Sequence, residues 1–342
     1  MDELLLGVDV GHLHIRFLLI DRFGSPYQPK AAIRIPLGNL GSWQEVIDAG
    51  LEQLGKPAIQ WLAVSMTGPV QNGKVTCSGF SWTCDEDLLA KSVPGLKGVH
   101  LTNDLLATAE IICTTIKRHQ VVNIRNGERD KKGLVAVLGV STGVGMASLQ
   151  KIDGSWTVQP SEGGHALFAP SSNLQLDILR WHLDTYGAPP TVEEVMGGRG
   201  LPTLYAFFAQ HAGLQDAVRL TEAPDFGSAI LAAAADPAKN PCSAATVIEM
   251  ARMILVEAGN LALRTMATRG VFLCGTFPAR LLPHLTDPRL APAFVGPSSG
   301  VVRPLLERIP VLVVREDYAA AIGVTQMAQH RFNDEFALVG QP

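Results

Sequence analysis

The sequence predicts an α/β protein made of two related lobes. An apolar strand, a glycine turn and a returning strand open the chain at Leu4–Asp21, and the same order recurs about 130 residues later at Gly133–Gln150. Strands alternate with helices in the second half, which is typical of parallel strand pairing. The length of 342 residues also suits two lobes. We therefore expect two mixed sheets flanked by helices.

The first half opens with an expected antiparallel meander. Leu4–Val10 is predicted to be a buried strand, Gly11 turns the chain, and Ile15–Asp21 returns, followed by a third strand at Ala31–Pro36. Ser42 is a favourable N-cap for a helix that runs to about residue 54. The other elements expected here are a strand at 59–65, a short helix at 85–92, a strand at 96–101 and a helix at 105–117.

The second half begins with Asn123–Lys132, a polar, charged segment that we expect to be a surface loop. A strand at Gly133–Gly139 then turns and returns as Met146–Gln150, and Asp153-Gly154 predicts a further hairpin turn before Trp156–Val158. The remaining expected elements are helices at 174–186, 191–196, 201–211, 228–235, 243–268 and 302–308, strands at 270–274 and 309–314, and a final helix from 317 to about 331.

The composition excludes several functional classes. Apolar residues make up 47% of the chain and charged residues 18%, which indicates a folded protein with a large core. A net charge of -4 without a basic stripe argues against nucleic-acid binding, and no apolar run is long enough to span a membrane. The start of the chain lacks the features of a signal peptide, so we expect a cytoplasmic protein. Dispersed cysteines without a C-x-x-C pair predict free thiols in a reducing compartment, namely Cys77, Cys84, Cys113, Cys242 and Cys274.

The pair Asn103-Asp104 stands where the strand at 96–101 gives way to a helix. Ligands of open α/β sheets bind at the carboxyl ends of strands, so an amide and a carboxylate here can face a substrate. The carboxylate can accept a proton from a hydroxyl group. The structural alternative is that Asp104 caps the helix.

Glycines and hydroxyls are concentrated at Gly139–Gly145, which contains Ser141, Thr142 and Gly143. Such a turn allows backbone N–H groups to approach a phosphate. It has no Walker lysine and does not open a helix, so it matches neither the P-loop nor the dinucleotide fingerprint. A tight hairpin that needs glycine explains the same residues.

Three weaker signals follow. The segment Glu162-Gly-Gly-His165 offers a carboxylate and an imidazole that suit sugar hydroxyls, or it is a polar surface turn. Glu193 is one of two acids in a first helical turn, where acids often interact only with the helix dipole. Gly275 follows a strand, where glycine permits close approach of a nucleotide or forms an ordinary turn. His12 and His14 are not read as a metal site.

Taken together, these motifs resemble the bacterial-type glucokinase family, which has the sugar kinase, heat-shock protein and actin fold. The resemblance covers nearly the whole chain, and Glu162-Gly-Gly-His165 is its most specific motif. The matching residues are Asn103-Asp104-Leu105, Gly139 through Gly145, Glu162 through His165 with Phe168-Ala169-Pro170, Glu193 with Gly198 and Gly200-Leu201, and Ile309-Pro310-Val311.

The resemblance implies an ATP-dependent hexose kinase that forms glucose 6-phosphate. Its fold would be the two-lobed ribonuclease-H-like fold, with a small lobe at 1–105 completed by the helix at about 313–332, a large lobe at 106–312 and an active-site cleft between the lobes. Asp104 would be the general base. The implied hexose ligands are Asn103, Asp104, Glu162, His165 and Glu193. The implied nucleotide-binding residues are Asp9, Gly11, Gly139, Thr142, Gly143 and Gly275. Mg²⁺ would arrive with ATP near Asp9, without a direct protein ligand, and a homodimer is expected.

The first phosphate loop departs from the family pattern. The family reads Asp-x-Gly-Gly-Thr-Asn, and this chain reads Asp9-Val-Gly11-His12-Leu13-His14. At the adenosine turn the expected Gly-Gly is Gly275-Thr276. The alternative hypothesis is therefore a catalytically impaired sugar-binding homologue that acts as a sensor or regulator. Glucose binding without ATP binding would favour this alternative.

Overall fold

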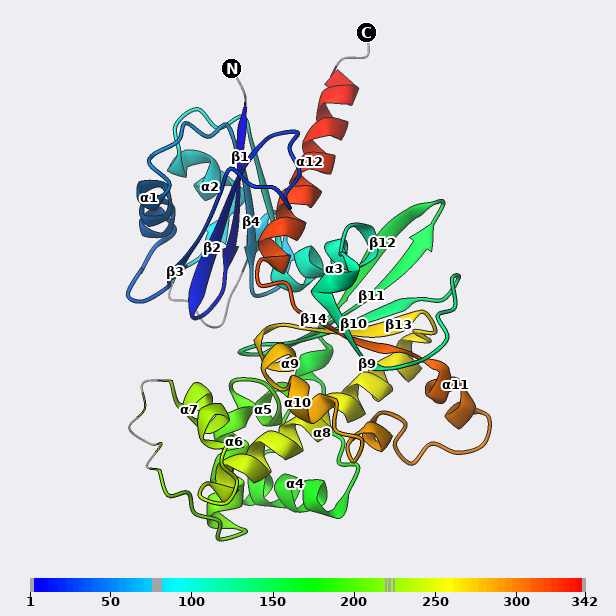
Figure 1. The fold of residues 1–342 in the computed structure, drawn as a ribbon. Coiled ribbons are helices and arrows are strands. Elements are labelled where there is room, and N and C mark those ends of the chain that lie inside the picture. The colour runs from blue at the N-terminus through cyan, green and yellow to red at the C-terminus, as the bar shows by residue number, and fades with distance from the viewer. Residues whose placement is uncertain (1–2, 76–81, 219, 221–222, 224, 340–342) are drawn as a thin grey trace. The chain divides into compact units, whose positions relative to one another are not determined.

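The computed structural model describes residues 3–75, 82–218, 220, 223 and 225–339. The chain divides into two compact units, 1–116 with 316–342, and 117–315 (Figure 1). The first unit extends past residue 105 to Ile116, because helix α3 (Asp104–Thr114) packs against helix α12 (Ala319–Val339). Each unit contains a mixed sheet with flanking helices, as expected from the sequence.

The first unit is built on a five-stranded sheet with the order β3-β2-β1-β4-β8. The pairs β1–β2 and β2–β3 are antiparallel, which confirms the predicted meander. The pairs β1–β4 and β4–β8 are parallel, so three adjacent strands end at the same edge. The strand bounds are Leu4–Val10 for β1, His14–Asp21 for β2, Ala31–Pro36 for β3, Trp61–Met66 for β4 and Gly98–Asn103 for β8.

Alternate residues of these strands pack against different helices. Leu6, Val8 and Val10 of β1 belong to the core that includes helices α1 (Trp43–Gln53) and α2 (Glu86–Ser92). Leu5 belongs to a second core that contains residues of α3 and α12. This alternation follows from the two-residue period of a strand. Asp9, two residues after Gly7, therefore lies on the face that α3 and α12 cover.

Two glycines allow the helices of this face to approach closely. A Cβ atom at Gly7 would overlap the Thr325 hydroxyl of α12. A Cβ atom at Gly323 of α12 would overlap the backbone carbonyl of Ala107 in α3. Figure 1 shows α12 and α3 beside each other in this unit. Helix α1 starts at the predicted cap, where the Ser42 hydroxyl accepts a hydrogen bond from the N–H of Glu45.

The first unit also contains a small antiparallel sheet. It contains β5 (Val70–Gln71), β6 (Lys74–Val75) and β7 (Cys84–Asp85). Residues 76–81, and with them Cys77, lie outside the described residues. Cys84, Cys113, Cys242 and Cys274 are free thiols, as predicted.

The second unit is built on a six-stranded sheet with the order β12-β11-β10-β13-β14-β9. The pairs β10–β13 and β13–β14 are parallel, as predicted for this half. The bounds are Val121–Arg125 for β9, Val135–Val140 for β10, Val144–Ile152 for β11, Ser155–Ser161 for β12, Gly270–Cys274 for β13 and Val311–Val314 for β14.

Strand β9 corrects one prediction. Residues 123–125 were expected to belong to a loop, but they lie in an edge strand that pairs antiparallel with β14. The partner strand is far away in the sequence, so the local pattern did not indicate the pairing. The predicted hairpin turn at Asp153-Gly154 is confirmed, and both residues have positive φ, of 47° and 88°.

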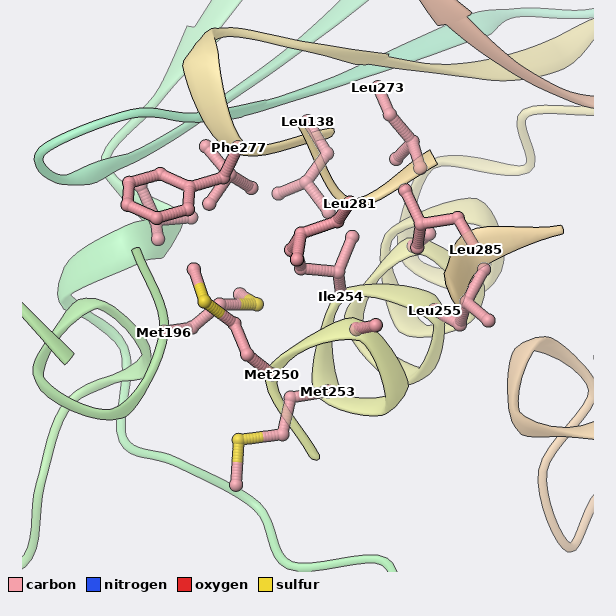
Figure 2. Packing of buried hydrophobic residues seen from close by; sticks show 14 of the residues in the cluster. Leu138, Met196, Met250, Met253, Ile254, Leu255, Leu273, Phe277, Leu281 and Leu285 are labelled. Carbon is pink, nitrogen blue, oxygen red and sulfur yellow. The ribbon is translucent and has the colours of Figure 1, made fainter. Parts of the chain in front are cut away.

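Helix α8 (Pro241–Thr265) is the centre of the core of the second unit. Figure 2 shows Met250, Met253, Ile254 and Leu255 of α8 among side chains from the sheet and from short helices. The other helices of the unit are α4 (Asn173–Tyr186), α5 (Val192–Val195), α6 (Gly200–Gln210), α7 (Phe226–Ala233), α9 (Thr276–Arg280), α10 (Leu282–Leu285) and α11 (Val302–Arg308), with 3₁₀ turns η1 (Arg118–Gln120), η2 (Gly163–His165) and η3 (Ala291–Phe294). Within the described ranges, no helix is both long enough and apolar enough to cross a membrane.

Candidate active site

Polar side chains gather at the carboxyl ends of the three parallel strands of the first unit. Asp9 lies near the end of β1, Ser65 near the end of β4, and Thr67 directly after β4. Asp104 directly follows β8. The strand registers place Asp9 beside Ser65 and Met66 beside Asn103, so neighbouring strands bring these groups together.

The Asp104 carboxylate has two donors. Its Oδ2 accepts a hydrogen bond of 2.9 Å from the Thr67 hydroxyl, and its Oδ1 accepts one of 2.8 Å from the N–H of Leu105. Burial raises the pKa of Asp104 above its ordinary value, and the Thr67 hydrogen bond is the largest opposing effect on that pKa. A carboxyl group with a raised pKa is a better proton acceptor near neutral pH than an exposed one.

Asn103, not Asp104, is the N-cap of α3. Its Oδ1 accepts from the N–H groups of Leu105 and Leu106, at 2.9 and 3.2 Å. The reading of Asp104 as the cap is therefore wrong, because Asn103 keeps the extended backbone of a cap and Asp104 is already helical. The Asn103 Nδ2 donates one N–H to the carbonyl of Gly68 at 3.0 Å, and an amide nitrogen carries a second N–H.

Asp9 is buried and paired. Its Oδ2 lies 3.3 Å from Nη1 of Arg16, and its Oδ1 accepts a hydrogen bond of 3.1 Å from the Ser65 hydroxyl. The pKa of Asp9 is raised to about 6, chiefly by burial and to a smaller extent by the negative charge of Asp104, against the opposing effect of Arg16. The two acids are thus close enough to influence each other.

The turn after β1 is closed by its own backbone. The N–H of Gly11 donates to the carbonyl of His14 at 3.1 Å, so this amide is used within the turn. His12 lies in the turn, and its charge lowers the pKa of Asp104. A phosphate group near this turn would meet side chains where the family has glycine and threonine.

The second unit brings Glu193, His165 and Glu162 together. His165 Nδ1 lies 3.8 Å from Oε1 of Glu193, and His165 Nε2 lies 3.9 Å from Oε2 of Glu162. Glu193 is buried and accepts a hydrogen bond of 3.0 Å from Nη1 of Arg199. Glu162 and His165 have exposed side chains, so this cluster can offer an imidazole and carboxylates to a polyhydroxyl ligand.

The two acids of α5 have different roles. Glu194 forms a capping box with Thr191, whose backbone N–H lies 2.7 Å from Oε2 of Glu194. These hydrogen bonds lower the pKa of Glu194. Glu194 therefore stabilises the helix start, whereas Glu193 points to His165 and Arg199.

The double glycine of the Glu162–His165 segment is required by crowding. A Cβ atom at Gly164 would overlap the carbonyl of Val144, and one at Gly163 would lie 2.5 Å from the sulfur of Met146. Both contacts are with β11. The 3₁₀ turn η2 can cross this strand only because neither residue has a side chain, and this crossing places His165 near α5.

The turn Ser141–Gly143 adjoins both Glu193 and Gly275. A Cβ atom at Gly143 would lie 2.7 Å from Oε2 of Glu193. Gly275 has a positive φ of 91°, and a Cβ atom there would lie 2.6 Å from the Ser141 hydroxyl and from the carbonyl of Val140. Gly139 pairs with Gly145 and Cys274. Gly139, Thr142, Gly143 and Gly275 thus form one small region of the second unit.

This turn has the backbone groups that a phosphate site needs. The carbonyls of Ser141 and Thr142 accept from the N–H groups of Gly198 and Arg199, at 2.8 and 3.0 Å. Among the described residues, no acceptor takes the N–H of Thr142 or Gly143. Two adjacent amides and the Thr142 hydroxyl suit an anion, so the residues present fit nucleotide phosphates.

Direct binding of a metal ion by protein side chains is a separate question from binding of nucleotide phosphates. In the part of the chain that the structure describes, no three His, Cys, Asp or Glu side chains gather to bind a metal ion. Asp9 is already bonded to Arg16 and Ser65. The residues fit Mg²⁺ carried by nucleotide phosphates, since Mg²⁺ usually keeps water and phosphate ligands.

Sequence reasoning missed Thr67, Ser65 and Arg199 as neighbours of the candidate residues. Arg199 had a usable signal, because it stands within the glycine-rich segment after Glu193. Ser65 and Thr67 had a weaker signal, because they lie two residues apart at the end of an apolar strand. Their contacts depend on which strands are neighbours, which the local pattern does not specify.

The fold of the chain matches the folds of two solved glucokinase structures. It matches a glucokinase from an Antarctic psychrotroph with a TM-score of 0.76 and 22% identity, over 96% of this chain and 100% of that one. It matches a glucokinase from Balamuthia mandrillaris, solved with glucose, with a TM-score of 0.75 and 17% identity, over 96% and 94%. The α/β fold with two mixed sheets is thereby confirmed.

The sequence comparisons define the family. The glucokinase profile matches residues 6–331, so the chain belongs to the glucokinase family of ATP-dependent kinases that phosphorylate glucose. The glucokinase of Marinobacter nauticus is 28% identical over 318 residues, which cover 93% of this chain and 95% of that protein. The glucokinase of Rhizobium meliloti is 30% identical over 332 residues, which cover 95% and 92%. The family expected from the sequence motifs is confirmed.

Proposed function

We propose that this chain transfers the γ-phosphoryl group of ATP to the 6-hydroxyl of glucose with Asp104 as the general base. The observation that carries the proposal is the buried Asp104 carboxylate, held at the end of β8 by Thr67 and by the N–H of Leu105. It accepts the hydroxyl proton as the oxygen attacks phosphorus. A positioned base contributes about 10²–10⁴ in rate.

Asn103, Glu162, His165 and Glu193 are proposed to hold the hexose. The second N–H of the Asn103 amide can donate to a hydroxyl, and the carboxylates of Glu162 and Glu193 can accept from hydroxyls. Arg199 is bonded to Glu193 and supports its orientation. Holding the sugar in one orientation matters because phosphoryl transfer depends largely on positioning.

The turn that contains Thr142 and Gly143 is proposed to bind nucleotide phosphates, with Gly139 beside it and Gly275 near the adenosine. Its two amides without acceptors among the described residues support this assignment. Asp9 and Gly11 are proposed to lie near the phosphates as well. Mg²⁺ bound to ATP would neutralise phosphate charge.

The proposal extends to the location and the oligomeric state of the protein. A cytoplasmic location is supported by the four free thiols of the described residues, because thiols persist in a reducing compartment. A homodimer remains a prediction from the family resemblance, and sedimentation equilibrium tests it.

The test is formation of glucose 6-phosphate from glucose, ATP and Mg²⁺, followed with a coupled dehydrogenase. We expect turnover in the natural protein and a loss of about 10²–10⁴ in kcat for Asp104→Asn. Equal turnover in the two proteins would overturn the assignment of the base. Glucose binding by calorimetry with neither turnover nor ATP binding would instead favour the sensor or regulator.

A further inference from the structure

We propose that Thr67 is a positioning residue that fixes the orientation of the Asp104 carboxylate for proton transfer. The proposal rests on the assignment of Asp104 as the base. Thr67 does not contact substrate in this proposal, and it acts only through Asp104.

The sheet topology places the two residues side by side. Strands β4 and β8 are parallel neighbours, with Met66 opposite Asn103 at their ends. Thr67 therefore directly follows β4, and Asp104 directly follows β8. The Thr67 hydroxyl donates to Oδ2 of Asp104 at 2.9 Å, across 37 residues of sequence.

Two hydrogen bonds define the plane of the carboxylate. The N–H of Leu105 holds Oδ1 at 2.8 Å, and Thr67 holds Oδ2. A carboxylate oxygen can accept more than one hydrogen bond, so each oxygen retains capacity for the proton of a hydroxyl group. Without Thr67, only Oδ1 would remain fixed, and the carboxylate could rotate about its Cβ–Cγ bond.

The hydroxyl also opposes the electrostatic effect of the surroundings. Burial raises the pKa of Asp104, and the nearby Asp9 is a second acid, paired with Arg16. On the other side, His12 in the turn after β1 lowers the pKa of Asp104. Thr67 is the neutral group that favours the ionised, proton-accepting form most directly.

The end of strand β4 and the residue that follows it provide one hydroxyl for each acid. Ser65 lies in β4, and Thr67 directly follows the strand. Ser65 donates to Asp9 at 3.1 Å, and Thr67 donates to Asp104 at 2.9 Å. Each carboxylate thus has its own hydroxyl donor from the segment 65–67, at the end of the strand between β1 and β8, and the two acids do not share a hydroxyl.

The experiment compares Thr67→Val, Thr67→Ser and Thr108→Val. Valine has nearly the shape of threonine but cannot donate, and serine restores the hydroxyl. Thr108 is the matched control, because its hydroxyl bonds the backbone carbonyl of Asp104 at 3.0 Å and leaves the carboxylate alone. Thr67→Ala replaces the valine variant if valine prevents folding.

The first readout is the pH profile of kcat/KM for glucose. In Thr67→Val, we expect the acidic limb of this profile to move up by about one pH unit, because the ionised base loses a hydrogen bond. We also expect kcat to fall about tenfold. Thr67→Ser and Thr108→Val should keep the natural limb. A second readout is the titration of the Asp104 carboxyl carbon by NMR, with the signal assigned by its absence in Asp104→Asn. The midpoint of this titration in Thr67→Val should move up by the same amount as the acidic limb.

The proposal would be overturned if, in a folded Thr67→Val protein, both the acidic limb of kcat/KM and the titration of the Asp104 carboxyl carbon stayed at the pH of the natural protein. A serine variant as impaired as the valine variant would also overturn it. Failure of the base assignment is distinguishable, because Asp104→Asn would then turn over as fast as the natural protein.

Discussion

Gly143→Ala would test whether Glu193 binds glucose. A Cβ atom at residue 143 would lie 2.7 Å from Oε2 of Glu193, closer than carbon and oxygen can pack. The φ of Gly143 is not positive, so alanine is compatible with the backbone there. Glu193 is buried and held by Arg199 at 3.0 Å, so its carboxylate must leave its present position.

The expected magnitude follows from one lost interaction. A hydrogen bond that involves a charged group contributes about 1.5–3 kcal/mol. Since about 1.4 kcal/mol corresponds to a factor of ten in affinity, glucose should bind about 10- to 150-fold more weakly. The fold should persist, because the displaced atoms are the far end of one side chain.

The assay is calorimetric titration with glucose in the absence of nucleotide, so that any phosphate contact of Gly143 does not contribute. Gly227→Ala is the matched control: it adds a methyl group in the same unit, where the nearest atoms are an ordinary 3.7 Å away. Glucose affinity of Gly143→Ala within twofold of this control would refute the role of Glu193, provided that both variants unfold at the same temperature.

Three other outcomes are expected. Asp104→Asn should bind glucose in calorimetry yet lose about 10²–10⁴ in kcat, and a loss of binding equal to the loss of rate would contradict a role in proton transfer. Gly323→Ala should lower the unfolding free energy in urea by about 1–3 kcal/mol, because its methyl group overlaps the carbonyl of Ala107; an unchanged midpoint would contradict the close packing of α12 on α3. Asp9 has a folded pKa of about 6, above its ordinary value of 3.8, so the folded state binds this proton more tightly and the contribution of Asp9 to stability falls as pH rises from 4 to 6. Asp9→Asn should remove that slope, at most about 1.4 kcal/mol per pH unit, and urea titrations of both proteins across this range should differ accordingly.

The elements that the sequence predicted best are those with a strong local pattern. The strand at Leu4–Val10 has the predicted bounds, and the helix after Ser42 has the predicted cap. Apolar runs and capping residues act over a few neighbours, so they are visible in the chain itself. The short helices α9 and α10 lack such a pattern and were not predicted.

Contacts between segments that are distant in the sequence explain where the predictions differ from the structure. Asn123 and Arg125 are polar and the segment adjoins charged residues, yet residues 123–125 form part of β9 because they pair with β14. The structural alternative for Asp104, a helix cap, is wrong although aspartate is a good cap, because Asn103 before it is equally good. The end of β8 sets which of the two keeps extended backbone, and Asn103 is the last strand residue.

Gly143 of the candidate site has a steric role that the sequence does not indicate. Gly143 was read as a phosphate-loop residue or as a hairpin requirement. The structure adds a steric reason, because the missing side chain makes room for Glu193. Such a reason depends on a residue fifty positions away, which no local pattern contains.

The departure at His12-Leu13-His14 changes side chains and leaves the backbone turn closed by Gly11 and His14. That turn uses its first amide internally, whereas the turn at Thr142 presents two amides without acceptors among the described residues. If amides provide the phosphate contacts, nucleotide affinity should depend more on the second turn than on the first. Divergence at His12 is then compatible with an ATP-dependent kinase, because the proposed base Asp104 and the amides of Thr142 and Gly143 do not require the family's glycine and threonine in the first turn.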